Sequence, residues 1–83
     1  MKLLYFAWVR QKIGRSEEEL SLPSNITTVA ALMDHLRRRG PGYEAAFEHP
    51  ERLRCAVNQE HARFDARIGP NDEIAFFPPV TGG

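Results

Sequence analysis

The sequence predicts an α+β domain in which one main helix packs across one face of a mixed sheet. Residues 29–36 are the clearest segment with apolar side chains at helical spacing. The longer apolar segments on either side instead alternate along the chain, as strands do, and are bounded by glycine and proline. The resulting order is strand, strand, helix, strand, a short strand and a final strand. One helix on one sheet is the simplest two-layer arrangement for these elements.

The first predicted strand runs from Lys2 to Arg10 and is apolar on both faces. Alternation places Leu3, Tyr5, Ala7 and Val9 on one face, and Leu4, Phe6 and Trp8 on the other. Such a strand is either central in its sheet or meets a partner on its outer face. After a turn at Gly14, a second strand is predicted from Glu18 to Leu22, where Pro23 ends it.

The helix is predicted to begin after Thr28, whose side chain can cap the first turn. Its buried stripe consists of Val29, Leu32, Met33 and Leu36. Residues 37–39 are three arginines, which suit the negative end of the helix dipole, and residues 40–42 stop the helix. A short helical turn is expected over residues 43–47.

The second half of the chain predicts the remaining strands. Alternation over residues 53–58 indicates a half-buried strand with Leu53, Cys55 and Val57 inward, and a short strand follows at residues 62–64. Residues 69–72 form a strong turn signal before the last strand, Glu73 to Phe77. If the first and last strands are neighbours, an uncovered apolar surface results. It contains Leu4, Phe6, Trp8, Ala75 and Phe77. Two alternatives would remove this surface: the strand register is shifted by one residue, or a loop over residues 43–47 covers the apolar side chains.

Composition excludes several classes of function. Lysine plus arginine and aspartate plus glutamate both number 11, so the net charge of zero argues against a nucleic-acid partner. No stretch approaches the roughly 20 apolar residues of a membrane span, and the single cysteine, Cys55, is expected to be buried and inert. A reduced, cytoplasmic protein is expected. Three histidines lack metal-ligand spacing, so no metal site is predicted, and residues 17–19 and 37–39 are expected to be solvated.

The chain ends on a segment without side-chain chemistry. We expect a β-sheet domain over residues 1–77 and an extended, flexible tail over residues 78–83, ending in Gly82 and Gly83. Pro78 and Pro79 cannot donate to a sheet and favour an extended course, so six residues can project about 19 Å. Glycine leaves the end thin enough to enter another protein's active site. The alternative is an ordinary frayed terminus.

Residues 71–83, and above all Phe-Phe-Pro-Pro-Val-Thr-Gly-Gly, resemble the C-terminus of the small, sulfur-carrying subunits of molybdopterin synthase. The opening Leu-Tyr-Phe-Ala at residues 4–7 and Ala-Val-Asn at residues 56–58 are similar to the same family. The resemblance implies a ubiquitin-like β-grasp fold. It also implies a carrier that is not an enzyme on its own but part of a sulfurtransferase complex.

The resemblance further implies that the Gly83 carboxylate is adenylated and then converted to a thiocarboxylate. Its sulfur would pass to cyclic pyranopterin monophosphate inside the large synthase subunit, in a heterotetramer. The partners implied are that subunit, an adenylating enzyme that uses ATP and Mg, and a sulfur donor; the carrier itself binds no cofactor. Gly82 would enter the narrow channel. The expected partner contacts are Phe6, Trp8, Ala75, Phe77, Pro78, Pro79, Val80 and Thr81. A carrier for thiamine thiazole or tRNA thiolation, a protein modifier, or a plain interaction module remain alternatives.

Overall fold

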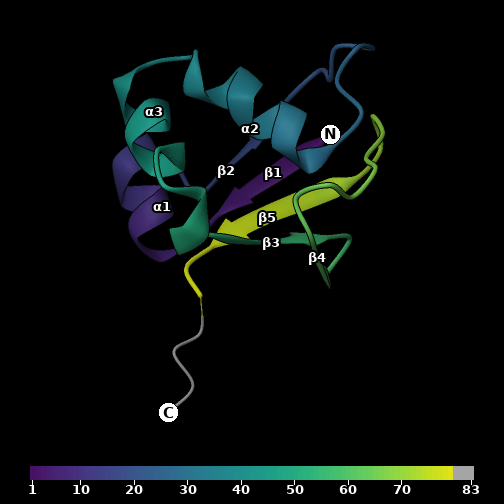
Figure 1. Ribbon diagram of the computed structural model, residues 1–83. Coiled ribbons are helices and arrows are strands. Elements are labelled where there is room, and N and C mark those ends of the chain that lie inside the picture. Colours follow the sequence, from purple (N-terminus) through teal and green to yellow (C-terminus); the bar gives the residue numbers. More distant parts are fainter. Residues whose placement is uncertain (80–83) are drawn as a thin grey trace.

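The computed structural model describes residues 1–79 and contains a five-stranded mixed sheet with helices on it (Figure 1). The elements in chain order are β1 (Lys2–Tyr5), α1 (Ala7–Ile13), β2 (Glu17–Glu19), α2 (Val29–Arg37), α3 (Pro41–Phe47), the 3-10 helix η1 (Pro50–Arg52), β3 (Arg54–Val57), β4 (Glu60–Ala62) and β5 (Glu73–Phe77). The strand order is β2-β1-β5-β3-β4. Only β1 and β5 run parallel, and they lie side by side, the arrangement that the sequence allowed for the first and last strands.

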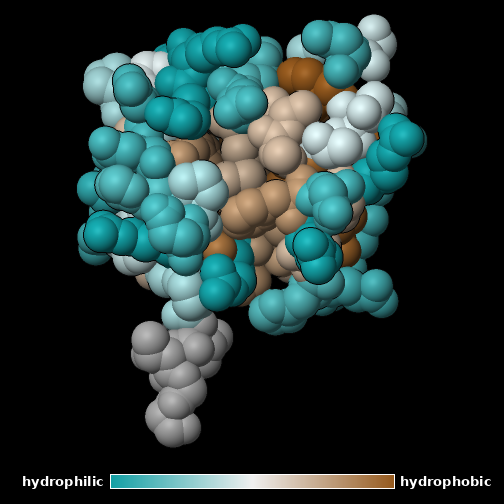
Figure 2. Space-filling model, in the orientation of Figure 1, coloured by the Kyte–Doolittle hydropathy of each residue, from teal (hydrophilic) through white to brown (hydrophobic). Residues whose placement is uncertain are grey.

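The core lies between this sheet and α2. Leu3 and Tyr5 of β1 and Ile74 and Phe76 of β5 are buried on the inner face. The predicted stripe of α2 is buried against them, and it consists of Val29, Leu32, Met33 and Leu36. The Thr28 hydroxyl accepts a hydrogen bond from the Ala31 amide at 3.2 Å, so the predicted cap is confirmed. Figure 2 shows apolar atoms gathered in the centre of one face, inside a hydrophilic ring.

The first strand is shorter than predicted, because the chain turns into α1 after Phe6. Ala7 has a φ of 52°, a left-handed conformation that breaks the strand. Val9 is buried as predicted, but from a helix. Gly14, predicted as a turn, is the C-cap of α1 with a φ of 91°, and its amide donates to the Arg10 carbonyl. In a short apolar segment, alternation and helical spacing fit the same residues, and here the helix forms.

Other boundaries also differ from the prediction. Strand β2 covers Glu17–Glu19 rather than residues 18–22, and β4 covers Glu60–Ala62 rather than residues 62–64. The expected helical turn is the full helix α3, which begins at Pro41, a favourable first helical residue. Ala56 lies opposite Ala75 on the outer face, as predicted, but it is buried there. The α+β class is confirmed, although α1 and α3 add to the single main helix that we expected. No helix in residues 1–79 has the length and apolar character needed to cross a membrane.

The predicted turn at residues 69–72 is confirmed, and it fixes the start of β5. Asp72 accepts a hydrogen bond from the Gly69 amide at 2.8 Å and another from the Asn58 side chain at 2.9 Å. These two bonds lower the pKa of the Asp72 carboxyl. Asn58 also accepts from the Glu73 amide at 2.9 Å. The β3–β4 hairpin is thereby fastened to the strand that leads into the tail.

Helices α1 and α3 meet at Gly42, which has no room for a side chain. A Cβ atom there would overlap the carbonyl oxygen of Lys12. Because backbone cannot move aside as a flexible side chain can, Gly42→Ala is expected to lower the free energy of unfolding by about 1–3 kcal/mol. Urea denaturation measures this change. Gly69→Ala is the matched control, since the nearest atom to its added Cβ lies 4.0 Å away. Equal stability of the two variants would contradict the close approach of α1 and α3.

Candidate partner-binding face and tail root

The outer face of the central strands carries a small apolar surface, here called the aromatic face: Leu4, Phe6, Ala75 and Phe77. Leu4 is the register partner of Ala75, and Tyr5 that of Phe76. The Phe6 amide donates to the Phe76 carbonyl at 3.1 Å, which continues this register and sets Phe6 beside Phe77. Within residues 1–79, Phe6 is the only large hydrophobic residue that is exposed, with a relative accessibility of 47%. Four of the five residues expected on this surface are therefore together.

Trp8 is the exception, and the prediction that it shares this face is wrong. It lies on α1, where successive side chains rotate by about 100° instead of alternating. Trp8 is half-buried and packs against the edge of the core. It lines a groove at the root of the tail together with Pro78 and Pro79.

That groove, here called the tail-root groove, has a volume of about 650 Å³. It lies between α1, α3, η1 and the two prolines. Its apolar lining consists of Trp8, Ala45, Ala46, Pro78 and Pro79, and its charged rim of Lys12, Glu48, His49, Glu51 and Arg52. The sequence pattern does not reveal this groove, because it predicts a strand over residues 7–10 and no element over residues 48–52. The proline run at residues 78–79 marks its position.

His61 extends the aromatic face toward β4. Its ring lies edge-on to Phe77, with centroids 5.4 Å apart and planes at 81°. The register sets His61 opposite Ala56, and Ala56 opposite Ala75. His61 was predicted only to be a surface histidine, and it is exposed. Pairing of a hairpin about residues 58–59 is the signal that would have found it.

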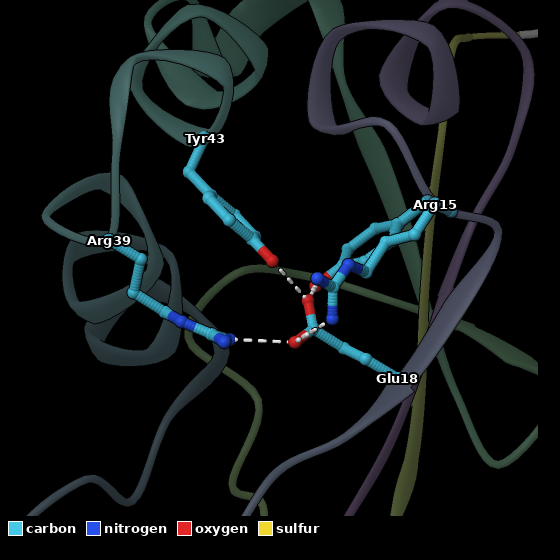
Figure 3. Close-up of polar contacts among 5 residues, drawn as sticks. Arg15, Glu18, Arg39 and Tyr43 are labelled. Carbon is cyan, nitrogen blue, oxygen red and sulfur yellow. Dashed lines mark hydrogen bonds and ion pairs between the residues drawn. The ribbon is translucent and has the colours of Figure 1, made fainter.

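The main polar cluster of the described residues lies around Glu18, on the other side of β1 from β5 (Figure 3). One carboxylate oxygen accepts from the phenols of Tyr5 at 2.8 Å and Tyr43 at 2.7 Å. The other accepts from Arg39 at 2.8 Å and lies 3.5 Å from Arg15. The Glu18 side chain is only 5% exposed, so the prediction that it is solvated is wrong. Hydrogen bonds thus join β2 to β1, to the loop between α2 and α3, and to α3.

The surroundings of Glu18 decide its charge. Burial alone would raise the pKa of its carboxyl, but the hydrogen bonds from Tyr43, Tyr5 and Arg39 outweigh burial and lower that pKa. Burial, followed by the hydrogen bond to Glu18, raises the pKa of both Tyr5 and Tyr43. The Arg39 guanidinium also lies 4.9 Å from the centre of the Tyr43 ring. The cluster is therefore a charged carboxylate with neutral phenols, which is a structural clamp.

Cys55 is buried, as predicted, and its thiol donates to the Ala62 carbonyl at 3.3 Å. Burial raises the pKa of this thiol, which disfavours the reactive thiolate. Among residues 1–79, no three histidine, cysteine, aspartate or glutamate side chains are grouped so as to hold a metal ion. Val80, Thr81, Gly82 and Gly83, which carry the predicted chemistry, lie outside the described residues.

A mixed sheet crossed by a helix, with its first and last strands parallel at the centre, defines a ubiquitin-like β-grasp protein. Residues 3–83 match the ThiS family. The chain is 40% identical over 83 residues to the molybdopterin synthase sulfur carrier subunit of Escherichia coli K12, covering 100% of this chain and 99% of that protein. It is 35% identical to the Mycobacterium tuberculosis subunit of the same name, over 100% and 96%. The chain belongs to the ThiS family and groups with its molybdopterin synthase sulfur carrier subunits.

Solved structures agree with this assignment. A putative molybdopterin converting factor, subunit 1, from Pyrococcus furiosus superposes with a TM-score of 0.77 at 30% identity, covering 95% of each chain. The small archaeal modifier protein 1 of Haloferax volcanii gives a TM-score of 0.77 at 25% identity, over 96% of this chain and 97% of that one.

Proposed function

We propose that this chain carries sulfur on Gly83 and delivers it to a pterin inside the large subunit of molybdopterin synthase. The observation that carries the proposal is the 40% identity, over essentially the full length of both chains, to a molybdopterin synthase sulfur carrier subunit. The aromatic face at the root of the tail supports it. The folded domain would then be a handle, and the terminal carboxylate the reactive group.

The chemistry proceeds through partners. A carboxylate is a poor electrophile, so a Gly83 oxygen first attacks the α-phosphorus of ATP and expels pyrophosphate. ATP and Mg are held by the adenylating enzyme. A donor of sulfide-level sulfur then attacks the acyl carbon and displaces AMP, which leaves a thiocarboxylate. The thiocarboxylate sulfur forms a bond to a carbon of cyclic pyranopterin monophosphate, and water cleaves the acyl–sulfur bond and regenerates the Gly83 carboxylate. Two such transfers complete the dithiolene. Gly82 and Gly83 suit narrow channels because they have no side chains.

The proposed partner contacts fall into two groups. Phe6, Ala75 and Phe77 would dock on the large subunit through the aromatic face, since aromatic residues commonly anchor interfaces. Trp8 would contribute from the tail-root groove. The tail would contact the large subunit's channel through Pro78, Pro79, Val80 and Thr81, so that the two glycines reach the active site. The assembly would be a heterotetramer in the cytoplasm, without nucleic acid or membrane, and the carrier would have no catalytic activity by itself.

Reconstitution tests this function. The chain is incubated with a molybdopterin synthase large subunit, an adenylating enzyme, ATP, Mg and a sulfur source, and conversion of cyclic pyranopterin monophosphate is followed. We expect conversion with the full chain and none with a chain that ends at Gly82. Equal conversion by both chains would contradict the proposal, because it would remove the Gly83 carboxylate from the reaction.

Attachment to other proteins is the second candidate function, because a small archaeal modifier protein shares the fold at 25% identity. The two functions differ in their products. A modifier forms an amide bond between Gly83 and a lysine of another protein, whereas a sulfur carrier regains its free carboxylate. Expression of the epitope-tagged chain, followed by denaturing electrophoresis, separates them: high-mass conjugates that need Gly83 would favour the modifier.

A further inference from the structure

The tail-root groove, with a volume of about 650 Å³, is larger than the hollows beside Glu44, Met1, Phe64 and Pro23, and no residue of the aromatic face lines it. Trp8 and Lys12 come from α1, Ala45 and Ala46 from α3, and Arg52 from η1. An apolar lining rimmed with charge, beside the point where the tail leaves β5, is the composition of a protein-binding groove.

The charges on the rim are unequally matched. His49 lies 4.0 Å from a Glu48 oxygen and 3.4 Å from a Glu51 oxygen, and these contacts are ion pairs only when the imidazole is protonated. Lys12 and Arg52 make no ion pair with any residue in the range 1–79. The groove therefore offers two cations beside an apolar lining, which suits a segment with a large apolar side chain and a carboxylate.

The chain's own last four residues could reach this groove, since they span about 13 Å at most from Pro79. They are a poor occupant energetically. Ordering four residues, two of them glycine, costs more free energy than the burial of one valine and one exposed ion pair returns. A partner segment that is already ordered within its own protein avoids most of this cost, because its residues lose little conformational freedom on entering the groove.

We infer that the groove receives an extended segment of the large synthase subunit, with an apolar side chain against Trp8 and a carboxylate near Lys12 and Arg52. This inference rests on the proposed function. Phe6 of the aromatic face and Trp8 of the groove are only two residues apart in the chain. The aromatic face is also small, since Phe6 is its one exposed residue, at 47%, whereas a stable interface buries about 800 Å² on each partner. A large subunit that contacts both the aromatic face and the tail-root groove buries more area than the aromatic face alone provides. It also fixes the direction in which the tail leaves the domain.

Trp8 reports on the groove directly, because the chain has a single tryptophan. The carrier is labelled with 5-fluorotryptophan and titrated with the large subunit, both as the full chain and as a chain ending at Pro79. We expect the fluorine resonance to shift on binding in both chains, and to be the same in the two free chains. An unmoved resonance at saturation would overturn the inference. So would free chains that differ, because the tail itself would then occupy the groove.

Charge reversal gives a second readout that leaves Trp8 intact. Lys12→Glu combined with Arg52→Glu is expected to raise the dissociation constant for the large subunit roughly tenfold or more. The matched control is Arg38→Glu with Arg67→Glu, which makes the same change in net charge at exposed positions outside the groove. Equal weakening by both pairs would overturn the inference in favour of general electrostatics. If the unaltered chain forms no complex, the proposed function itself fails, and the inference fails with it.

Discussion

Phe77→Ala is expected to weaken binding of the carrier to the large synthase subunit by about 2 kcal/mol, or roughly 30-fold, while the domain stays folded. Phe77 projects from the last residue of β5, one residue before the tail prolines. It packs beside exposed Phe6 and edge-on to His61. Because the Phe77 side chain is partly exposed, its removal costs the free domain little stability. The same removal abolishes its whole contact with a partner.

Isothermal titration calorimetry measures the affinity, and circular dichroism confirms folding. Phe64→Ala is the matched control, because Phe64 is also a half-buried phenylalanine but lies outside the aromatic face. It follows β4, and its carbonyl accepts a hydrogen bond from the Ala30 amide of α2. We expect normal affinity from that control. An affinity unchanged by Phe77→Ala would remove the aromatic face from the interface.

Glu18→Ala is expected to lower the free energy of unfolding by about 3 kcal/mol. The substitution leaves the buried phenol of Tyr5 without its acceptor and Arg39 without its partner. It also removes the hydrogen bonds that join β2 to α3 and to the loop that follows α2. Denaturant unfolding measures the change. Glu17→Gln serves as the control, since Glu17 is exposed and forms only a surface pair with Lys2, worth about 0.5 kcal/mol. Equal effects of the two variants would contradict the clamp.

The Glu18 clamp also predicts a pH dependence with a definite sign. The folded-state pKa of Glu18 is lowered, so its stabilising contribution is fully present above the unfolded pKa of about 4.3. It is lost as the pH falls through the lower, folded value. The stability difference between the unaltered chain and Glu18→Gln should therefore be constant above about pH 5 and shrink below about pH 4. A difference that grows on acidification would mean that Glu18 is protonated in the native state.

Local signals predicted the centre of the fold well. Helix α2 has a side-chain cap and four buried residues at helical spacing, and β5 lies between a strong turn and two prolines, so each has its own boundaries in the sequence. Residues 7–13 have no such start signal. Their helix begins at an alanine with a left-handed backbone conformation, which residues other than glycine rarely adopt and which the sequence pattern does not show.

The candidate site divides in the same way. Phe6, Ala75 and Phe77 came together as expected because pairing of two strands follows from their alternation. Trp8 lies in the tail-root groove and not on the aromatic face, because residues 7–13 form a helix where a strand was predicted. The buried state of Glu18 needed knowledge of Tyr43 and Arg39, which lie more than 20 residues away and meet it only in the folded chain.

The central claim is that Gly83 carries the sulfur, and intact-mass spectrometry of the carrier tests it most directly. After incubation with the adenylating enzyme, ATP, Mg and a sulfur source, we predict that one oxygen is replaced by sulfur. Fragmentation should locate the sulfur on Gly83, and a chain ending at Gly82 should stay unmodified. Sulfur found on Cys55 instead, or no mass change while the enzyme thiolates the E. coli carrier subunit, would contradict the account.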